Sequence, residues 1–252
     1  MISPLLLLAL SSCRVEPKNN EEPIRTAIHA DTIDHSLRHS ILADTAGMEA
    51  DLRLIERKLG PLDPGIRDQL VAVEVTYFSF SDSTYSVIDT KRLYSGVLVV
   101  HACVASEVRT LFEEMLRDTF PIAKVVPMNR YGLNADSTGW NDARSMADNN
   151  TSAFNYRTKP TSGEHSKHAQ GIAIDINPRQ NPMIRHDDQG VVVEPPRSHY
   201  KPTAPGTLTR SNTQRYLSKL GWSWGGRWPR PQDNQHIEKS RGSCPHLRFS
   251  LK

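Results

Sequence analysis

The stretch "SKHAQGIAIDINP", residues 166–178, decides the fold prediction for this chain. If residues 171–176 form a β-strand, their side chains alternate between two faces. The three isoleucines then point into a core, whereas Asp175 lies on the opposite face with the glycine and the alanine. His168 can fold back toward Asp175, because Gly171 permits unusual backbone angles. Taken alone, this histidine and aspartate are weak evidence for a site, and a satisfied surface pair is the commoner explanation.

Outward from this stretch, strands and helices come in mixed order without regular βα alternation. This order predicts an α+β fold, a single domain with a central antiparallel sheet flanked by helices. The polar stretch 129–151 is predicted to be a long loop of the kind that often carries function. By residue pattern, we expect helices at 47–58, from Ser106 onward and at 211–222, and strands at 71–80, 92–102, 122–126, 152–157, 171–176, 190–194 and near the C-terminus.

The amino-acid composition limits the classes of function that this protein can have. The chain has 252 residues, of which 37% are hydrophobic and 23% charged, as in an ordinary soluble protein. Its 31 basic and 28 acidic residues leave a net charge of only +3, which argues against a nucleic-acid partner.

The N-terminus has the pattern of an export signal. In "MISPLLLLALSSC", residues 1–13, a leucine-rich run precedes small residues and Cys13, although no basic residue comes before the leucines. The end of this run resembles a bacterial lipoprotein processing site, so we expect a signal peptide at 1–13 with Cys13 lipidated, a polar tether at 14–40 and a domain at 41–252. The protein would then be extracytoplasmic and lipid-anchored to a bacterial membrane. The alternative is a buried apolar segment with a chance cysteine.

The other two cysteines leave two alternatives open. Cys103 and Cys244 could pair in an oxidising compartment, or they could be two free buried thiols.

A second polar motif lies near the C-terminus. In "PQDNQHIEK", Asp233 precedes His236 by three residues. Two histidines and an aspartate can bind zinc with the fourth position open, and a further carboxylate must then accept the proton of the attacking water. Asp233 is placed for that role, although an acid that caps a turn is the alternative.

Together these motifs resemble the zinc peptidases of peptidoglycan. The pattern S-x-H-x-x-G-x-A-x-D at 166–175 is followed by W-x-W-G-G-x-W at 222–228 and D-x-x-H at 233–236. This order is similar to D-alanyl-D-alanine carboxypeptidases, vancomycin-resistance dipeptidases and phage L-alanyl-D-glutamate endolysins. Residues 145–157 also resemble the substrate-binding segment of that family, and the likeness spans about residues 70–240.

The resemblance implies a role for five residues. His168, Asp175 and His236 match the Zn²⁺ ligands, and Asp233 matches the catalytic carboxylate. Arg157 matches the arginine that holds the substrate or its oxyanion, a role that suits a planar, permanently charged guanidinium.

Several neighbouring residues leave alternatives. His165 could replace His168 as a ligand, and Glu238 could be the base or a partner of His236. The three tryptophans of the W-x-W-G-G-x-W motif could line a cleft or pack in the core. Ser166 could hydrogen-bond near the site or cap a turn.

The function predicted from the sequence is zinc-dependent hydrolysis of peptidoglycan stem peptides, with an L-alanyl-D-glutamate endopeptidase favoured over a D-alanyl-D-alanine carboxypeptidase. The rival from another class is a non-catalytic zinc module, because Hedgehog domains resemble this fold and keep a zinc site. Asp233 distinguishes the peptidase from the zinc module, since a site that has lost catalysis needs no carboxylate beside the metal. The partners would be the stem peptide and, through Cys13, a membrane.

Overall fold

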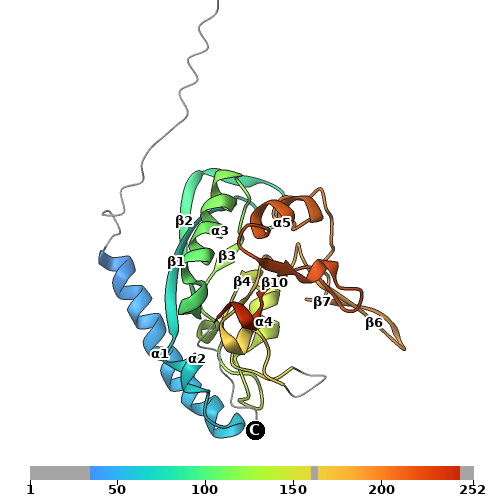
Figure 1. The fold of residues 1–252 in the computed structure, drawn as a ribbon. Helices are drawn as coiled ribbons and strands as arrows, with labels where there is room; N and C mark the ends of the chain where they lie inside the picture. Colours follow the sequence, from blue (N-terminus) through green and yellow to red (C-terminus); the bar gives the residue numbers. More distant parts are fainter. Residues whose placement is uncertain (1–34, 160–163, 245–252) are drawn as a thin grey trace, which may run out of the picture. The chain divides into compact units, whose positions relative to one another are not determined.

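The computed structural model describes residues 35–159 and 164–244, with side chains from residue 47 onward (Figure 1). It has the α+β fold class predicted from the sequence, which is thereby confirmed. The signal peptide at 1–13, Cys13 and most of the tether at 14–40 lie outside the described residues. Among the described helices, none combines the length and the apolar character needed to cross a membrane.

Helix α1 (His35–Leu59) begins earlier than predicted. The prediction placed this helix at 47–58 and ended the tether at residue 40, so the helix takes in the end of the predicted tether. The reason is visible in the sequence, because Leu37 and Ile41 continue the helical spacing of Met48, Leu52 and Ile55 toward the N-terminus.

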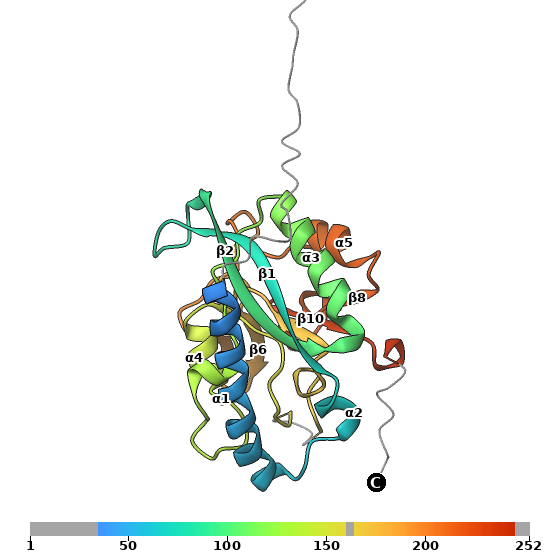
Figure 2. The same cartoon turned by 90° about the vertical axis from the view of Figure 1, so that its left-hand side faces the viewer.

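A long hairpin forms the middle layer of the fold. Strands β1 (Leu70–Phe80) and β2 (Ile88–His101) pair antiparallel, with α1 on one face and α3 (Ala105–Arg117) on the other (Figure 2). Successive residues of β2 serve the two faces: Leu98 and Val100 pack in the same core cluster as α3, whereas Val99 packs with α1. Two apolar cores therefore lie back to back across one hairpin. The remaining helices of the described chain are α2 (Pro64–Arg67), α4 (Asp142–Ala147) and α5 (Arg210–Leu217).

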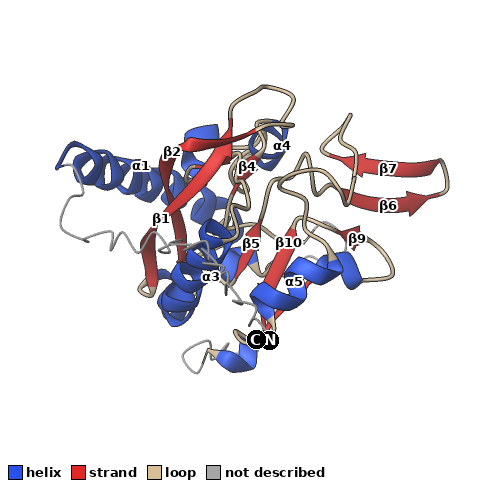
Figure 3. Cartoon of the chain, turned by 90° about the horizontal axis from the view of Figure 1, so that it is seen from above, coloured by secondary structure: helices blue, strands red, loops and turns tan. Residues whose placement is uncertain are grey.

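A three-stranded antiparallel sheet carries the sequence motifs. Its order is β5 (Ala173–Asp175), β10 (His236–Lys239) and β8 (Trp222–Trp224) (Figure 3). Ile172, Ile174 and Ile176 are fully buried in the core beside α3, as the alternation predicts. The sheet thus joins the two halves of the predicted site, which lie far apart in the sequence.

The predicted single central sheet is divided into several small ones. A parallel pair joins β3 (Lys124–Val125) to β4 (Asn150–Thr151), and an antiparallel sheet joins β7 (Gly190–Glu194), β6 (Met183–Asp187) and β9 (Gln232–Asp233). The β6–β7 hairpin projects beyond the rest of the sheet layer (Figure 3).

The strand predicted at 152–157 is wrong. Ser152 makes only an isolated bridge to Asp175, and the Phe154 N–H then donates to the Val99 carbonyl at 3.0 Å. The segment changes partner within two residues, so no ladder forms, although its side chains are buried as in a strand. The predicted loop at 129–151 in turn contains α4 and β4.

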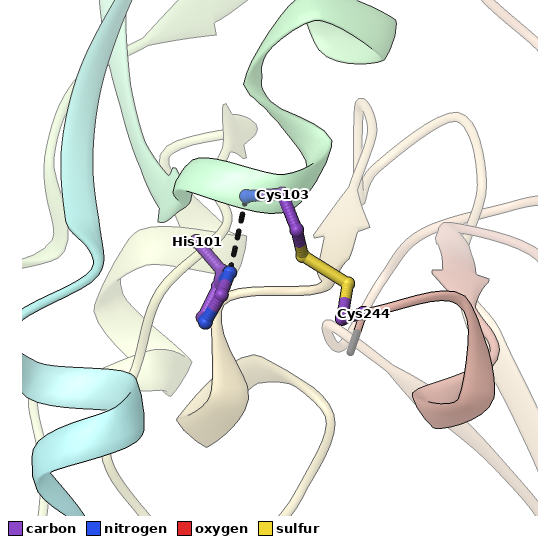
Figure 4. Close-up of side chains that lie close together, drawn as sticks. All are labelled: His101, Cys103 and Cys244. Carbon is purple, nitrogen blue, oxygen red and sulfur yellow. Dashed lines mark hydrogen bonds between the residues drawn. A yellow bond between two sulfur atoms is a disulfide. The ribbon is translucent and has the colours of Figure 1, made fainter. Parts of the chain in front are cut away.

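Cys103 and Cys244 form a disulfide, which settles the alternative that the sequence left open (Figure 4). The bond ties the short turn after β2 to the chain beyond β10, with the two Cα atoms 5.7 Å apart. His101 lies beside the pair, and its Nδ1 accepts the Cys103 N–H at 3.1 Å. Both sulfurs are used by the bond, so this cluster is structural.

We expect the disulfide to stabilise the fold because it closes a long loop, since its cysteines are separated by 141 in sequence number. The variant Cys103→Ser with Cys244→Ser should lose about 3–5 kcal/mol of unfolding free energy. Urea unfolding of the two proteins measures this loss. Wild-type protein treated with a dithiol reductant should show the same loss, and an unchanged midpoint after reduction would contradict the expectation.

Candidate metal centre

Three donor atoms from separate elements converge on one point. His168 lies in a short 3₁₀ turn (His168–Gln170), Asp175 ends β5, and His236 begins β10 directly opposite Asp175. Asp175 Oδ1 lies 3.2 Å from His168 Nε2 and 3.1 Å from His236 Nδ1, and these two nitrogens are 3.1 Å apart. All three side chains are buried. The atoms therefore form a nearly equilateral triangle of two nitrogens and one oxygen.

The hydrogen bonds of the two imidazoles fix which nitrogen faces the triangle. His168 Nδ1 lies 2.6 Å from the Ala153 carbonyl oxygen, so it carries the proton and leaves a lone pair on Nε2. His236 Nε2 lies 3.1 Å from Glu238 Oε2, so the same argument leaves a lone pair on Nδ1. Two lone pairs and a carboxylate oxygen thus point at one another, an arrangement that demands a positive charge between them.

The triangle has the size that zinc requires. With metal–ligand distances of 2.0–2.1 Å, two ligands at a tetrahedral angle lie about 3.3 Å apart. The observed separations of 3.1–3.2 Å are close to this value. The carbonyl and the carboxylate behind the two imidazoles are also the partners that metal-bound histidines usually have. The residues present therefore fit a zinc ion.

The pKa shifts of Asp175 and His236 also indicate that a positive charge is favoured between the three donors. Burial alone would raise the pKa of Asp175, but the imidazoles of His168 and His236 outweigh it and hold that pKa below its usual range. Burial would likewise lower the pKa of His236, yet its hydrogen bonds to Asp175 and Glu238 raise it. A proton or a metal ion at His236 Nδ1 would supply the positive charge that the neighbouring carboxylates favour.

Asp233 is the second acid of the site, and its surroundings differ. It ends β9, where it pairs with Met183 of β6, and it lines the same cleft as the three donors. Burial, followed by repulsion from Asp175, raises the pKa of Asp233 to about 7. Its Oδ1 is buried and makes no hydrogen bond with any described residue. The carboxylate is therefore available to a water or a substrate.

Two glycines allow this arrangement. Gly171 ends the 3₁₀ turn with φ +68, and a Cβ there would lie 2.6 Å from the backbone nitrogen of His101. At Gly225 a Cβ would lie 2.6 Å from the Asp233 carbonyl oxygen and 3.3 Å from the His236 Cβ. The W-G-G turn thus serves mainly to let its backbone approach the two functional residues closely.

Arg157 lies on the wall of the cleft, which has a volume of about 800 Å³. Its Nε lies 3.0 Å from Asp142 Oδ2, at the start of α4. The sequence analysis did not single out Asp142, because an aspartate in a polar loop carries no distinguishing signal. The ion pair holds the Arg157 side chain at the cleft, with about 27% of that side chain exposed.

The structure distinguishes between the alternative roles that the sequence left open for three neighbouring residues. His165 stacks flat on Tyr156 and is outside the donor triangle. Glu238 contacts the far nitrogen of His236, which is the position of a partner of that histidine. Ser166 Oγ accepts the Ala169 N–H and so caps the turn that presents His168.

The three tryptophans divide between the two predicted roles. Trp222 and Trp224 are buried, and their indole N–H groups donate to Glu107 and to the Asn234 carbonyl. Trp228 instead lines the cleft, with its ring centroid 5.3 Å from that of His236.

The comparison with protein families agrees with this geometry. Residues 160–239, which include all three donors and Asp233, match the family model described as D-alanyl-D-alanine carboxypeptidase. The match covers less than half of the chain, and it supports a hydrolase of the metallopeptidase class. Members of the matched family are zinc-dependent. No curated protein and no solved structure matches the chain.

We expect the purified protein to hold about one zinc per chain, because the three donors have the separations of a zinc site. The variant His168→Ala should lose that zinc, as measured by elemental analysis after dialysis. The matched control is His165→Ala, which removes a histidine three residues away and should keep the metal. Equal zinc in wild type and His168→Ala would contradict this assignment.

Proposed function

We propose that this protein is a zinc-dependent peptidase that hydrolyses the stem peptides of peptidoglycan. The observation that carries the proposal is the convergence of two imidazole lone pairs and the Asp175 carboxylate, with the unpartnered Asp233 carboxylate in the same cleft. When bound by His168, Asp175 and His236, zinc would act as a Lewis acid toward the scissile carbonyl and acidify its water.

Asp233 is the general base of the proposed reaction. Its Oδ1 lacks a hydrogen-bond partner among the described residues, so it can accept the proton of the attacking water. The same carboxyl group can then deliver a proton to the leaving amine. Its position at the end of β9 is fixed by pairing to β6, which keeps the carboxylate directed at the substrate.

Arg157 is the proposed anion-binding residue. Asp142 orients its guanidinium, and the exposed part of the side chain faces the cleft. A planar guanidinium can hold a peptide carboxylate or the developing oxyanion through two parallel hydrogen bonds.

The variant Asp233→Asn keeps the shape of the side chain but cannot accept a proton. We expect zinc to remain while kcat falls by about 100-fold or more, the usual scale for the loss of a general base. The comparison is Glu238→Gln, which should weaken zinc binding by about 10–100-fold and keep turnover at saturating zinc. If the Asp233→Asn variant stays active and the Glu238→Gln variant is inactive in excess zinc, Glu238 is the general base instead.

We place the scissile bond between L-Ala and D-Glu. The D-x-x-H motif and the W-G-G-x-W turn are closer to the L-alanyl-D-glutamate endopeptidases than to the carboxypeptidases that share the ligand set. The second candidate is release of the terminal D-Ala, which the description of the matched family favours.

Mass spectrometry of a digested pentapeptide stem distinguishes these bonds. We expect free L-alanine and a tetrapeptide that begins with D-Glu, because the cut falls after the first residue. Loss of a single C-terminal alanine, with the L-Ala bond intact, would assign the protein to the carboxypeptidases instead.

We also propose a location from the N-terminal pattern alone. Lipidation of Cys13 would anchor the enzyme to a bacterial membrane, on the side where peptidoglycan lies, through the polar segment predicted as a tether at 14–40. The rival hypothesis, a non-catalytic zinc module, gives Asp233 no role.

A further inference from the structure

A second hollow adjoins the metal cleft. It has a volume of about 320 Å³ and lies between α5 and the W-x-W-G-G-x-W segment. Trp228 lines both this hollow and the metal cleft, and its ring is 5.3 Å from that of the proposed ligand His236. Trp228 is therefore the residue that the two cavities share.

The lining of the hollow combines indole carbon with polar groups. Trp222 and Trp224 are largely buried, and their N–H groups donate to Glu107 and to the Asn234 carbonyl, so the little of these side chains that reaches the hollow is ring carbon. The half-buried Trp228 offers the more open indole. On the rim, the Arg227 guanidinium donates to Gln214 Oε1 at 2.8 Å, which holds both planar polar groups in place.

This combination suits a saccharide. A sugar ring has an apolar C–H face that packs on aromatic carbon, and hydroxyl and amide groups that hydrogen-bond to planar polar side chains. A hollow of about 320 Å³ lies within the usual size range of small-ligand pockets and can hold one sugar ring.

We propose that this hollow binds the muramyl sugar of the substrate; the inference rests on the proposed function and deepens it. The L-Ala residue is attached directly to this sugar, so cleavage of the L-Ala–D-Glu bond places the sugar one residue from the metal. Cleavage between the two D-Ala residues places it three residues further away, which is about 10 Å of extended chain. A sugar subsite that shares Trp228 with the metal cleft fits the first bond and not the second.

The test compares two substrates of the full-length enzyme in excess zinc: the pentapeptide stem and the same peptide carrying N-acetylmuramic acid. We expect kcat/KM to be at least about 10-fold higher for the muramyl peptide, since each tenfold is only about 1.4 kcal/mol of added binding. In Arg227→Ala combined with Gln214→Ala, the ratio of the two kcat/KM values should fall to near one. The matched control is Arg210→Ala, an exposed arginine of α5 outside the hollow, which should keep the wild-type ratio.

Equal kcat/KM values of the wild type for the two substrates would overturn the proposed subsite. A kcat/KM ratio that is unchanged in the double variant would also overturn it. Cleavage of neither substrate would count against the proposed function instead. In that event the subsite is decided by titrating N-acetylmuramic acid alone and following tryptophan fluorescence. Saturable quenching in wild type that is lost in the double variant supports the subsite, and no quenching in wild type overturns it.

Discussion

The arrangement of the site depends on the meeting of two imidazole lone pairs and one carboxylate within 3.2 Å of one another. Buried charge and buried lone pairs are costly unless they are compensated. The backbone carbonyl of Ala153 and the carboxylate of Glu238 hold the two rings in the tautomers that create this demand. The packing and hydrogen bonds of the site thus hold three donors in an arrangement that favours a positive charge among them.

The surrounding fold keeps these donors in register. Asp175 and His236 face each other across the β5–β10 pairing, so a shift of β10 by one residue would turn the His236 side chain to the other face of the sheet, away from Asp175. At the other end of β10, Lys239 is buried, and its ammonium group pairs with Glu107 of α3 at 2.8 Å. Trp222 donates to the same glutamate at 2.6 Å. Strand β10 is therefore fixed at one end by an ion pair with a helix, and at its other end the proposed ligand His236 pairs with Asp175.

The sequence predicted those parts of the protein that depend on local pattern. The alternating isoleucines of 171–176 identified a buried strand with an acid on its other face, and the apolar stripe from Ser106 identified α3. The segment 152–157 was mistaken for a strand, because burial of its side chains resembles a strand while its backbone changes partner after Ser152. The start of α1 was missed, because the polar residues before it concealed a helical spacing.

For the candidate site, too, the sequence predicted only the features that depend on local pattern. Histidines and acids at characteristic spacing can be recognised from the chain, and the three proposed ligands do converge. Their supporting contacts cannot be recognised in this way. The Ala153 carbonyl has no signature in the sequence, and the pairing of Arg157 with Asp142 depends on where α4 places its first turn. Likewise, the disulfide could not be deduced, because spacing does not give the distance between Cys103 and Cys244.

The two aspartates of the site show how environment separates chemical roles. Asp175 lies between two imidazoles, which favour its charged form and make it suited to bind a metal. At Asp233, burial and repulsion from Asp175 outweigh the attraction of the two imidazoles and of Arg157, so its carboxyl group holds a proton more readily. A pair of acids whose pKa values are driven apart in this way is the arrangement from which a ligand and a base can be told apart.

The three-residue spacing between Asp233 and His236 has a physical reason. The two residues between them are anchored, because the Asn234 side chain donates to the Pro182 carbonyl at 2.9 Å and the Ile176 N–H donates to the Gln235 carbonyl at 3.0 Å. The Asn234 carbonyl in turn accepts the Trp224 indole N–H at 2.8 Å. This fixed turn ends one small sheet with the proposed base and begins the next with a proposed ligand. The D-x-x-H motif is therefore the junction between two sheets, and its spacing sets where the base lies relative to the metal.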